Sequence, residues 1–128
     1  MTEERFNFED LDVWNDAVYF ADVCIDMAER ITTPRKHYRL LEQIESASTS
    51  VALNIAERKG RYSRKEFVHF LHIARGSLFE TVTLLTIFKN RKWIKPEAYQ
   101  AVKKYAVKLG KRINALITAI NKSSIKSQ

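Results

Sequence analysis

The stretch of sequence that decides the fold runs from Ser50 to Glu80 and reads SVALNIAERKGRYSRKEFVHFLHIARGSLFE. Apolar residues recur at helical spacing on both sides of its centre, which is typical of two amphipathic helices. Between them lies a short turn, residues 58–65, that has no acidic residue and has five basic ones: Arg58, Lys59, Arg61, Arg64 and Lys65. The stretch therefore predicts two rigid helices joined by a charged corner.

The second of these helices begins with a complete start signal. Ser63 and Glu66 have the spacing of a capping box, in which the serine hydroxyl accepts a hydrogen bond from the backbone of the third helical residue. Tyr62 and Phe67 occupy the two positions of a hydrophobic staple. Gly60 suits the position just after the preceding helix, because glycine adopts a left-handed backbone at little cost.

Composition excludes several classes of protein. The 128 residues include only three Gly and two Pro, too few for a turn-rich β protein. Cys24 is the single cysteine, so an intramolecular disulfide is impossible, and this fits a reducing compartment. The first ten residues are acidic and polar, unlike a secretory signal, and no apolar run is long enough to cross a bilayer. We expect a soluble, cytoplasmic protein with one domain over residues 1–128.

The net charge of +7 hides a strong asymmetry along the chain. Residues 1–29 contain nine acidic residues and one basic residue, whereas residues 30–128 contain 21 basic and six acidic residues. Such a basic remainder suits a polyanion, RNA or DNA. The alternative is an ordinary solvated surface, in which the acidic first helix neutralises its basic neighbours. Composition leaves both interpretations open.

Four helices account for nearly the whole chain, at about residues 9–31, 36–59, 64–89 and 96–121, followed by a frayed polar tail at 122–128. Pro34 ends the first helix, because proline cannot continue it and the preceding Thr33 then favours an extended backbone. Pro96 occupies the first turn of the fourth helix, its preferred place. Short connections place successive helices antiparallel, so we predict an all-α, up-down-up-down four-helix bundle.

Apolar spacing also predicts which side of each helix faces the core. The first helix has a stripe of Leu11, Trp14, Val18, Ala21, Ile25 and Ala28, with Cys24 on or beside it. The second has a seam of Leu41, Ile44, Ser48, Val51 and Ile55. The fourth has an unbroken repeat of Tyr99, Val102, Ala106, Leu109, Ile113, Leu116 and Ile120.

The third helix carries more apolar residues than one core-facing side requires. Its stripe consists of Phe67, Leu71, Ala74, Leu78, Leu85 and Phe88, and further apolar residues, among them Ile73, Phe79 and Ile87, spread around the helix. A helix that is apolar on most sides is buried on most sides. We therefore expect a second interface, most simply with another copy of the chain, although single exposed apolar residues are also normal on monomers. Gly76 marks a place where another backbone can approach closely.

Catalytic and metal-binding patterns are weak. Glu66 and His69 form one Glu-x-x-His pair, whereas a di-iron bundle needs two such pairs and two further glutamates. The sequence contains no phosphate-binding glycine loop, dinucleotide fingerprint or nucleophile elbow. Cys24 fits a small core residue better than a nucleophile. We expect a protein that is not an enzyme and has no catalytic residue, metal site or cofactor.

Polar residues lie along one edge of the second helix. Ser50, Asn54 and Glu57 follow one another at spacings of four and three, and Arg75 and Ser77 are candidate partners on the antiparallel third helix. Buried polar groups need hydrogen-bond partners. We favour a structural polar network that fixes the register of the two helices over direct contact with a ligand.

Basic residues form three groups, which we expect to bind nucleic acid together. The first is the corner at residues 58–65, which should be the densest phosphate-binding surface because a helix start already favours an anion. The second is Lys89, Arg91 and Lys92, with Lys95 and Trp93 beside them. The third is Lys104, Lys108 and Lys111, a solvent-facing stripe on the fourth helix that would connect the two ends. Tyr62 and Trp93 either stack on unpaired bases or pack onto the ends of the bundle.

Three motifs give the chain a resemblance to a known family. They read Phe8-Glu9-Asp10-Leu11-x-Val13-Trp14; Asn54-Ile55-Ala56-Glu57 followed by Gly60-Arg61-x-Ser63-x-Lys65-Glu66-Phe67; and Phe70-Leu71-x-x-Ala74-Arg75-Gly76-Ser77-Leu78-x-Glu80. In these motifs the chain resembles the bacterial four-helix-bundle proteins encoded by intervening sequences of ribosomal RNA genes, and the related accessory variability determinants of diversity-generating retroelements. Arg58 stands where glycine is frequent in the family. Glu45 and Ser46 stand where two basic residues are frequent, which removes positive charge from the middle of the second helix.

The resemblance implies a ring-like homopentamer without catalytic residues. For the retroelement members it implies a basic ring that binds nucleic acid and associates with a reverse transcriptase, whereas for the ribosomal members it implies no particular role. We expect an accessory factor that binds RNA or DNA. The competing expectation is a protein-interaction scaffold whose basic loops dock an acidic partner. Salt dependence of nucleic-acid binding distinguishes the two, because phosphate contacts release counterions.

Overall fold

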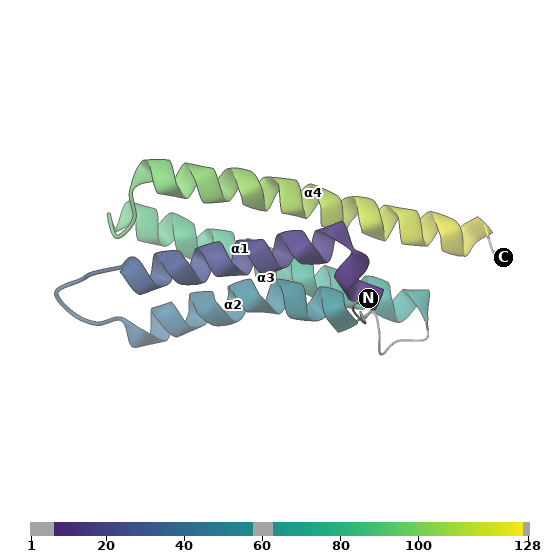
Figure 1. The fold of residues 1–128 in the computed structure, drawn as a ribbon, viewed down its shortest axis with the longest axis horizontal. Helices are drawn as coiled ribbons and strands as arrows, with labels where there is room; N and C mark the ends of the chain where they lie inside the picture. The colour runs from purple at the N-terminus through teal and green to yellow at the C-terminus, as the bar shows by residue number, and fades with distance from the viewer. Residues whose placement is uncertain (1–6, 58–62, 127–128) are drawn as a thin grey trace, which may run out of the picture.

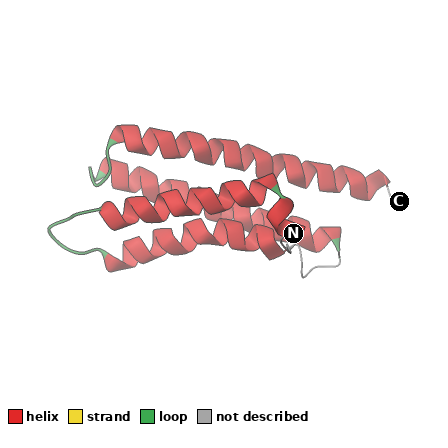
Figure 2. Cartoon of the chain, in the orientation of Figure 1, coloured by secondary structure: helices red, strands yellow, loops and turns green. Residues whose placement is uncertain are grey.

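The computed structural model describes residues 7–57 and 63–126, and all regular structure in these two ranges is helical (Figure 1 and Figure 2). A short 3-10 helix, η1 (Asn7–Asp10), is followed by α1 (Asp12–Arg30), α2 (Tyr38–Ala56), α3 (Arg64–Asn90) and α4 (Pro96–Lys126). Each α-helix packs against two neighbours, in the cyclic order α1, α2, α3 and α4. The connections alternate between the two ends of the molecule (Figure 1). The predicted all-α, four-helix arrangement is confirmed. Within the described ranges, no helix is long and apolar enough to cross a membrane.

The core fills the space between the four helices. α3 buries the side predicted from its spacing, and so do the first four turns of α4 from Tyr99 to Ile113. Phe20, Phe88, Leu71, Leu109 and Ile113 are among the largest fully buried side chains. Burial of side chains of this size contributes roughly 1.5–3 kcal/mol each, so these residues hold the bundle together.

The core-facing side of α1 differs from the predicted stripe. Its buried residues are Val13, Ala17, Phe20, Ala21, Cys24 and Ala28. Trp14, Val18 and Ile25 of the predicted stripe are only half-buried, and they line a groove between α1 and α2. α1 is apolar on two adjoining sides, so apolar spacing alone does not decide which side meets the core.

Four helix ends also differ from the prediction. α2 ends at Ala56, three residues earlier than expected. α1 begins at Asp12 because the preceding residues form η1 and Leu11 has an extended backbone. α2 begins at Tyr38, two residues later than expected. α4 continues to Lys126, beyond the ends of the other helices in Figure 1, so residues 122–126 are helical and not a frayed tail. The chain after Gly110 contains no glycine or proline to stop the helix.

α3 begins with the predicted cap. Ser63 has an extended backbone, and its Oγ accepts a hydrogen bond from the Glu66 backbone N–H at 3.0 Å. The predicted staple through Tyr62 and the predicted helix stop at Gly60 lie outside the described residues.

α3 ends in a Schellman motif that is built without glycine. Lys92 has a left-handed backbone with a φ of 65°. The Trp93 N–H donates to the Phe88 carbonyl and the Lys92 N–H donates to the Lys89 carbonyl, both at 2.9 Å. These two hydrogen bonds define the motif, and a hydrophobic contact normally accompanies them. The Trp93 and Phe88 rings supply it, with centroids 5.3 Å apart, so the motif holds Trp93 at the end of the bundle.

Candidate nucleic-acid interface

The helices of the bundle meet the connections at two opposite ends (Figure 1). The corner end holds η1, the start of α1, the end of α2 and the start of α3. The loop end holds the α1–α2 and α3–α4 connections. The predicted basic groups are divided between these two ends and the outer side of α4.

At the corner end, Arg64 and Lys65 lie exposed in the first turn of α3. The other three members of the predicted corner group, Arg58, Lys59 and Arg61, lie outside the described residues. Glu9 of η1 and Asp12 in the first turn of α1 belong to the same end. The corner end therefore mixes both signs of charge, which weakens its attraction for phosphate groups.

The predicted lysine stripe lies on the outer side of α4. Lys104, Lys108 and Lys111 are all exposed, and their spacing of four and three residues places them on one side of the helix. From residue 98 to its end, α4 contains seven basic residues and no acidic residue. No carboxylate on this part of α4 neutralises the stripe.

Lys89, Arg91 and Lys92, the second predicted group, lie at the loop end. The Lys89 ammonium lies 4.6 Å from the centre of the Tyr99 ring, and the Tyr99 hydroxyl lies 2.9 Å from the Thr86 hydroxyl. The hydrogen bond with Thr86 and the positive charges nearby lower the pKa of Tyr99. Lys89 is thus held against α4, whereas Arg91 and Lys92 are exposed to solvent.

The basic residues of the α1–α2 connection also belong to the candidate interface, although they were not predicted from the sequence. Arg35, Lys36 and Arg39 are exposed at the loop end. The imidazole of His37 and the indole of Trp93 join the two connections, with ring centroids 4.5 Å apart. Residues 30–39 and 89–95 together contain eight basic residues and no acidic residue. The basic, acid-free sequence of residues 30–39 indicates an anion-binding segment. Only the packing of the helices brings this segment beside residues 89–95.

The structure builds a small polar network between α2 and α3. Asn54 Nδ2 donates to the Ser50 carbonyl at 2.8 Å and to Ser50 Oγ at 2.9 Å. Ser77 Oγ of α3 donates to the same Ser50 Oγ at 2.9 Å. All three residues are half-buried. The predicted set of Ser50, Asn54 and Ser77 therefore comes together between the two helices.

Arg75 and Glu57, the other two predicted members, lie elsewhere. The Arg75 guanidinium donates to Asn114 Oδ1 of α4 at 2.8 Å and lies 2.9 Å from His72 Nδ1. Residues 75 and 77 point to different neighbours because two positions along a helix differ by about 200° in direction. Glu57 is exposed just beyond the end of α2.

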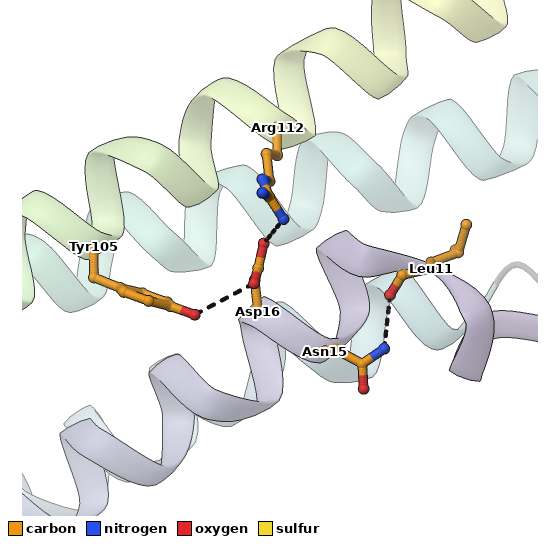
Figure 3. A network of polar contacts seen from close by, with 5 residues as sticks. All are labelled: Leu11, Asn15, Asp16, Tyr105 and Arg112. Atoms are coloured by element: carbon orange, nitrogen blue, oxygen red, sulfur yellow. Dashed lines mark hydrogen bonds and ion pairs between the residues drawn. The ribbon is translucent and has the colours of Figure 1, made fainter.

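A second polar cluster, which sequence reasoning did not identify, joins α1 to α4 (Figure 3). Asp16 of α1 forms an ion pair with Arg112 of α4, and its Oδ1 accepts a hydrogen bond from the Tyr105 hydroxyl at 3.3 Å. Burial and the charge of Asp16 raise the pKa of Tyr105. One carboxylate of the acidic first helix thus neutralises a basic residue of α4, so part of the charge asymmetry serves the fold.

The outer side of α3 carries three large apolar side chains that the single chain leaves exposed, among exposed polar residues such as His72, Glu80 and Thr83. Ile73, Phe79 and Ile87 expose 39%, 59% and 42% of their surface. A side chain added at Gly76 would meet no atom within 4 Å, so the same side of the helix is open there. Phe79 also lines a groove between α3 and α4, together with Val107. These exposed apolar side chains are candidates for contact with another protein.

The residues that the sequence offers for metal binding or catalysis do not come together in the fold. Glu66 and His69 are both exposed on α3. Among the residues that the structure describes, no three His, Cys, Asp or Glu side chains are placed to hold a metal ion. Cys24 is fully buried, and burial raises the pKa of its thiol to about 12. Because the thiolate is the reactive form, this cysteine is inert at neutral pH.

Comparisons with known proteins agree with this architecture. A solved structure of a protein of unknown function from the S23 ribosomal protein family of Bacteroides thetaiotaomicron is similar to this chain. The two are 24% identical, the match covers 82% of this chain and 97% of the other, and the TM-score is 0.76. This likeness concerns the fold. No curated protein matches the chain. The model of a family described as 23S rRNA-intervening sequence protein matches residues 9–115, which include α1, α2, α3 and most of α4. The chain therefore belongs to the 23S rRNA-intervening sequence protein family.

Proposed function

We propose that this protein is a non-catalytic accessory factor that binds nucleic acid, RNA or DNA, through its basic surface. The observation that carries the proposal is the basic, acid-free character of α4 beyond residue 97, which adjoins the eight basic residues of the loop end. The exposed stripe of Lys104, Lys108 and Lys111 starts about two turns from the beginning of α4. Contacts to phosphate supply most of the affinity of such surfaces and depend little on base sequence.

Salt dependence tests this proposal. A labelled, structured RNA is titrated with protein at several salt concentrations, and fluorescence anisotropy gives the dissociation constant. We expect log affinity to fall steeply with log salt. The triple variant Lys104→Gln, Lys108→Gln, Lys111→Gln should reduce the slope by about three, because each lost phosphate contact lowers it by about one. A slope that is the same in wild type and in the folded triple variant would contradict a role of the stripe.

A scaffold that docks an acidic protein is the second candidate function. The groove between α1 and α2, which Trp14, Val18 and the 65% exposed Leu53 line, offers an apolar contact surface to a protein partner. The exposed basic residues of the loop end would attract the acidic groups of that partner. A folded protein that binds neither RNA nor DNA at low salt would leave the scaffold as the better function.

We also propose that the chain assembles with itself through the outer side of α3. The exposed Ile73, Phe79 and Ile87 support this, since several large apolar side chains exposed on one side of a helix are suited to an interface. The family resemblance implies a ring of five subunits. Light scattering should give a mass several times the 14.9 kDa of one chain.

A pair of matched variants tests this interface. Phe79→Glu should dissociate the assembly, because it would bury an unpaired charge. Ala115→Glu, at an exposed position on the outer side of α4, should leave the assembly intact. A wild-type monomer at micromolar concentration contradicts the proposal, as does a Phe79→Glu variant that assembles normally.

Association with a reverse transcriptase rests on the resemblance to the retroelement accessory proteins. Mixing the purified chain with a reverse transcriptase encoded beside its gene should give a complex in gel filtration. A gene that lies inside a ribosomal RNA operon, with no reverse transcriptase nearby, would contradict this partner.

A further inference from the structure

A cavity of about 360 Å³ lies at the loop end, between the α1–α2 connection and the adjoining ends of α1 and α2. Its apolar lining consists of Ala28, Ile31 and Leu41, which are buried or half-buried. Its charged lining consists of Glu29, Lys36 and Glu45, which are exposed. The cavity therefore has an apolar interior and a charged rim. This is the usual composition of a small-ligand site.

Two aromatic residues also line the cavity. Tyr38, the first residue of α2, exposes 64% of its surface, and the Lys36 ammonium lies 5.8 Å from the centre of its ring. His37 packs on Trp93, which in turn packs on the fully buried Phe88. A row of three rings thus extends from the core to the cavity and holds His37 in place. An exposed ring among basic side chains is the feature on which unpaired bases stack.

Both signs of charge meet at the rim of the cavity, where Lys36 lies with Glu29 and Glu45. Arg35, Lys36 and Arg39 are exposed on or beside the α1–α2 connection, and the Thr33 hydroxyl donates a hydrogen bond to the Arg35 carbonyl. Glu29 and Glu45 are the two carboxylates that line the cavity itself. Basic side chains attract phosphate, whereas carboxylates repel phosphate and accept hydrogen bonds from the amino groups of bases. A nucleotide would therefore place its base inside the cavity and its phosphates outside.

We propose that this cavity binds one unpaired nucleobase of a single-stranded nucleic acid. The base stacks on Tyr38, and the backbone phosphates on either side contact Arg35, Lys36 and the basic α3–α4 connection. Glu29 and Glu45 favour bases that carry an amino group, such as adenine and cytosine, over uracil. The inference rests on the proposed nucleic-acid function and adds to it a base-contacting site.

Fluorescence of a modified base tests the site directly. The probe is a short single-stranded oligoadenylate RNA that contains one 2-aminopurine, whose emission falls when its base stacks. Wild type should quench the emission and bind the probe more tightly than an oligouridylate of equal length. Tyr38→Ala should weaken binding at least about fivefold and abolish the quenching, since loss of one stacked base has an effect of this size. Tyr19→Ala, which removes another exposed tyrosine from the middle of α1, is the matched control and should bind as wild type does.

Selectivity provides a second readout that a change in folding would not reproduce. The double variant Glu29→Gln and Glu45→Gln should reduce the preference for oligoadenylate over oligouridylate, while total binding does not fall because negative charge is removed. The same titration with oligodeoxyadenylate shows whether the base comes from RNA or from DNA. Equal affinity and equal quenching in wild type and Tyr38→Ala would overturn the site. A paired RNA hairpin that binds as tightly as the single strand would do so as well.

The outcomes separate this site from the proposed function. If the stripe variant of α4 loses affinity but Tyr38→Ala does not, the cavity site is wrong and the nucleic-acid function stands. If wild type binds no oligonucleotide at low salt, both are wrong.

Discussion

Toward the corner end α1 and α4 are joined by the ion pair of Asp16 with Arg112, whereas at the loop end the two connections are joined by packed rings. The ion pair uses one basic residue of α4 for the fold. The contacts of Phe88, Trp93 and His37 use none. Arg30 pairs with Asp26 at 3.3 Å and Lys89 lies against the Tyr99 ring, but the other basic residues of the loop end are exposed to solvent.

The same contrast appears in the surroundings of the basic residues. At the corner end, Arg64 and Lys65 share their end of the bundle with Glu9 of η1 and Asp12 of α1. At the loop end, eight basic residues lie in two segments without an acidic residue. Glu29 and Glu45 also lie at the loop end, so this end has an excess of basic residues rather than a lack of carboxylates, and the excess of one sign of charge attracts an anion.

The largest expected loss of stability comes from removing a ring that holds the loop end together. Phe88→Ala should lower the free energy of unfolding by about 3–5 kcal/mol, because Phe88 is fully buried and supports Trp93. Phe67→Ala at the corner end should cost less, since Phe67 is 7% exposed. Urea unfolding of both variants measures the difference. Equal losses would mean that the two ends are held equally tightly.

The ion pair should show a smaller effect that depends on salt. Asp16→Ala removes the acceptor of Tyr105 and Arg112 and should cost about 1–3 kcal/mol. High salt should reduce this loss but leave that of Phe88→Ala unchanged. Asp22→Ala, at an exposed position on α1, is the control and should have little effect. A loss at Asp16 that does not respond to salt would argue against an electrostatic contact.

The buried Cys24, in the core between the two ends, should make the free energy of unfolding depend on pH in the alkaline range. Burial raises the pKa of Cys24 from 9.0 to about 12, so above pH 9 the unfolded thiol ionises while the folded thiol does not. The free energy of unfolding should therefore fall with rising pH, by up to about 1.4 kcal/mol per pH unit from this group. Below pH 9 the thiol is protonated in both states and contributes no pH dependence. Cys24→Ala should lose less stability than wild type between about pH 8 and about pH 10. Equal losses would remove Cys24 as the cause.

The two ends of α3 should give the smallest effects, of opposite sign. Lys92→Gly should raise the free energy of unfolding by up to about 1 kcal/mol, because Lys92 has a left-handed backbone that glycine adopts without strain. Ser63→Ala should lower it by about 1 kcal/mol, because the cap to Glu66 is lost. Thermal unfolding measures both changes. A destabilised Lys92→Gly variant would show that the lysine side chain contributes more than the backbone strain costs.

The sequence by itself determined the number, order and antiparallel course of the helices. Pro34, Pro96 and the Ser63 cap act locally, so their effect on the backbone can be read without knowledge of the fold. The buried side of α3 matches the predicted stripe from Phe67 to Phe88, which only Thr81 interrupts. The sequence also indicated the basic stripe of α4, which needs only the helical repeat.

Tertiary structure decided what depends on neighbours distant in the chain. α1 has two apolar sides, and packing against α2 and α4 selected the one through Val13, Phe20 and Cys24. Asp16 meets Arg112 across 96 positions, and His37 meets Trp93 between two connections. Local patterns do not contain such contacts, since they arise only when helices settle at a particular rotation and register. For the same reason the loop end, rather than the corner alone, emerged as a basic surface.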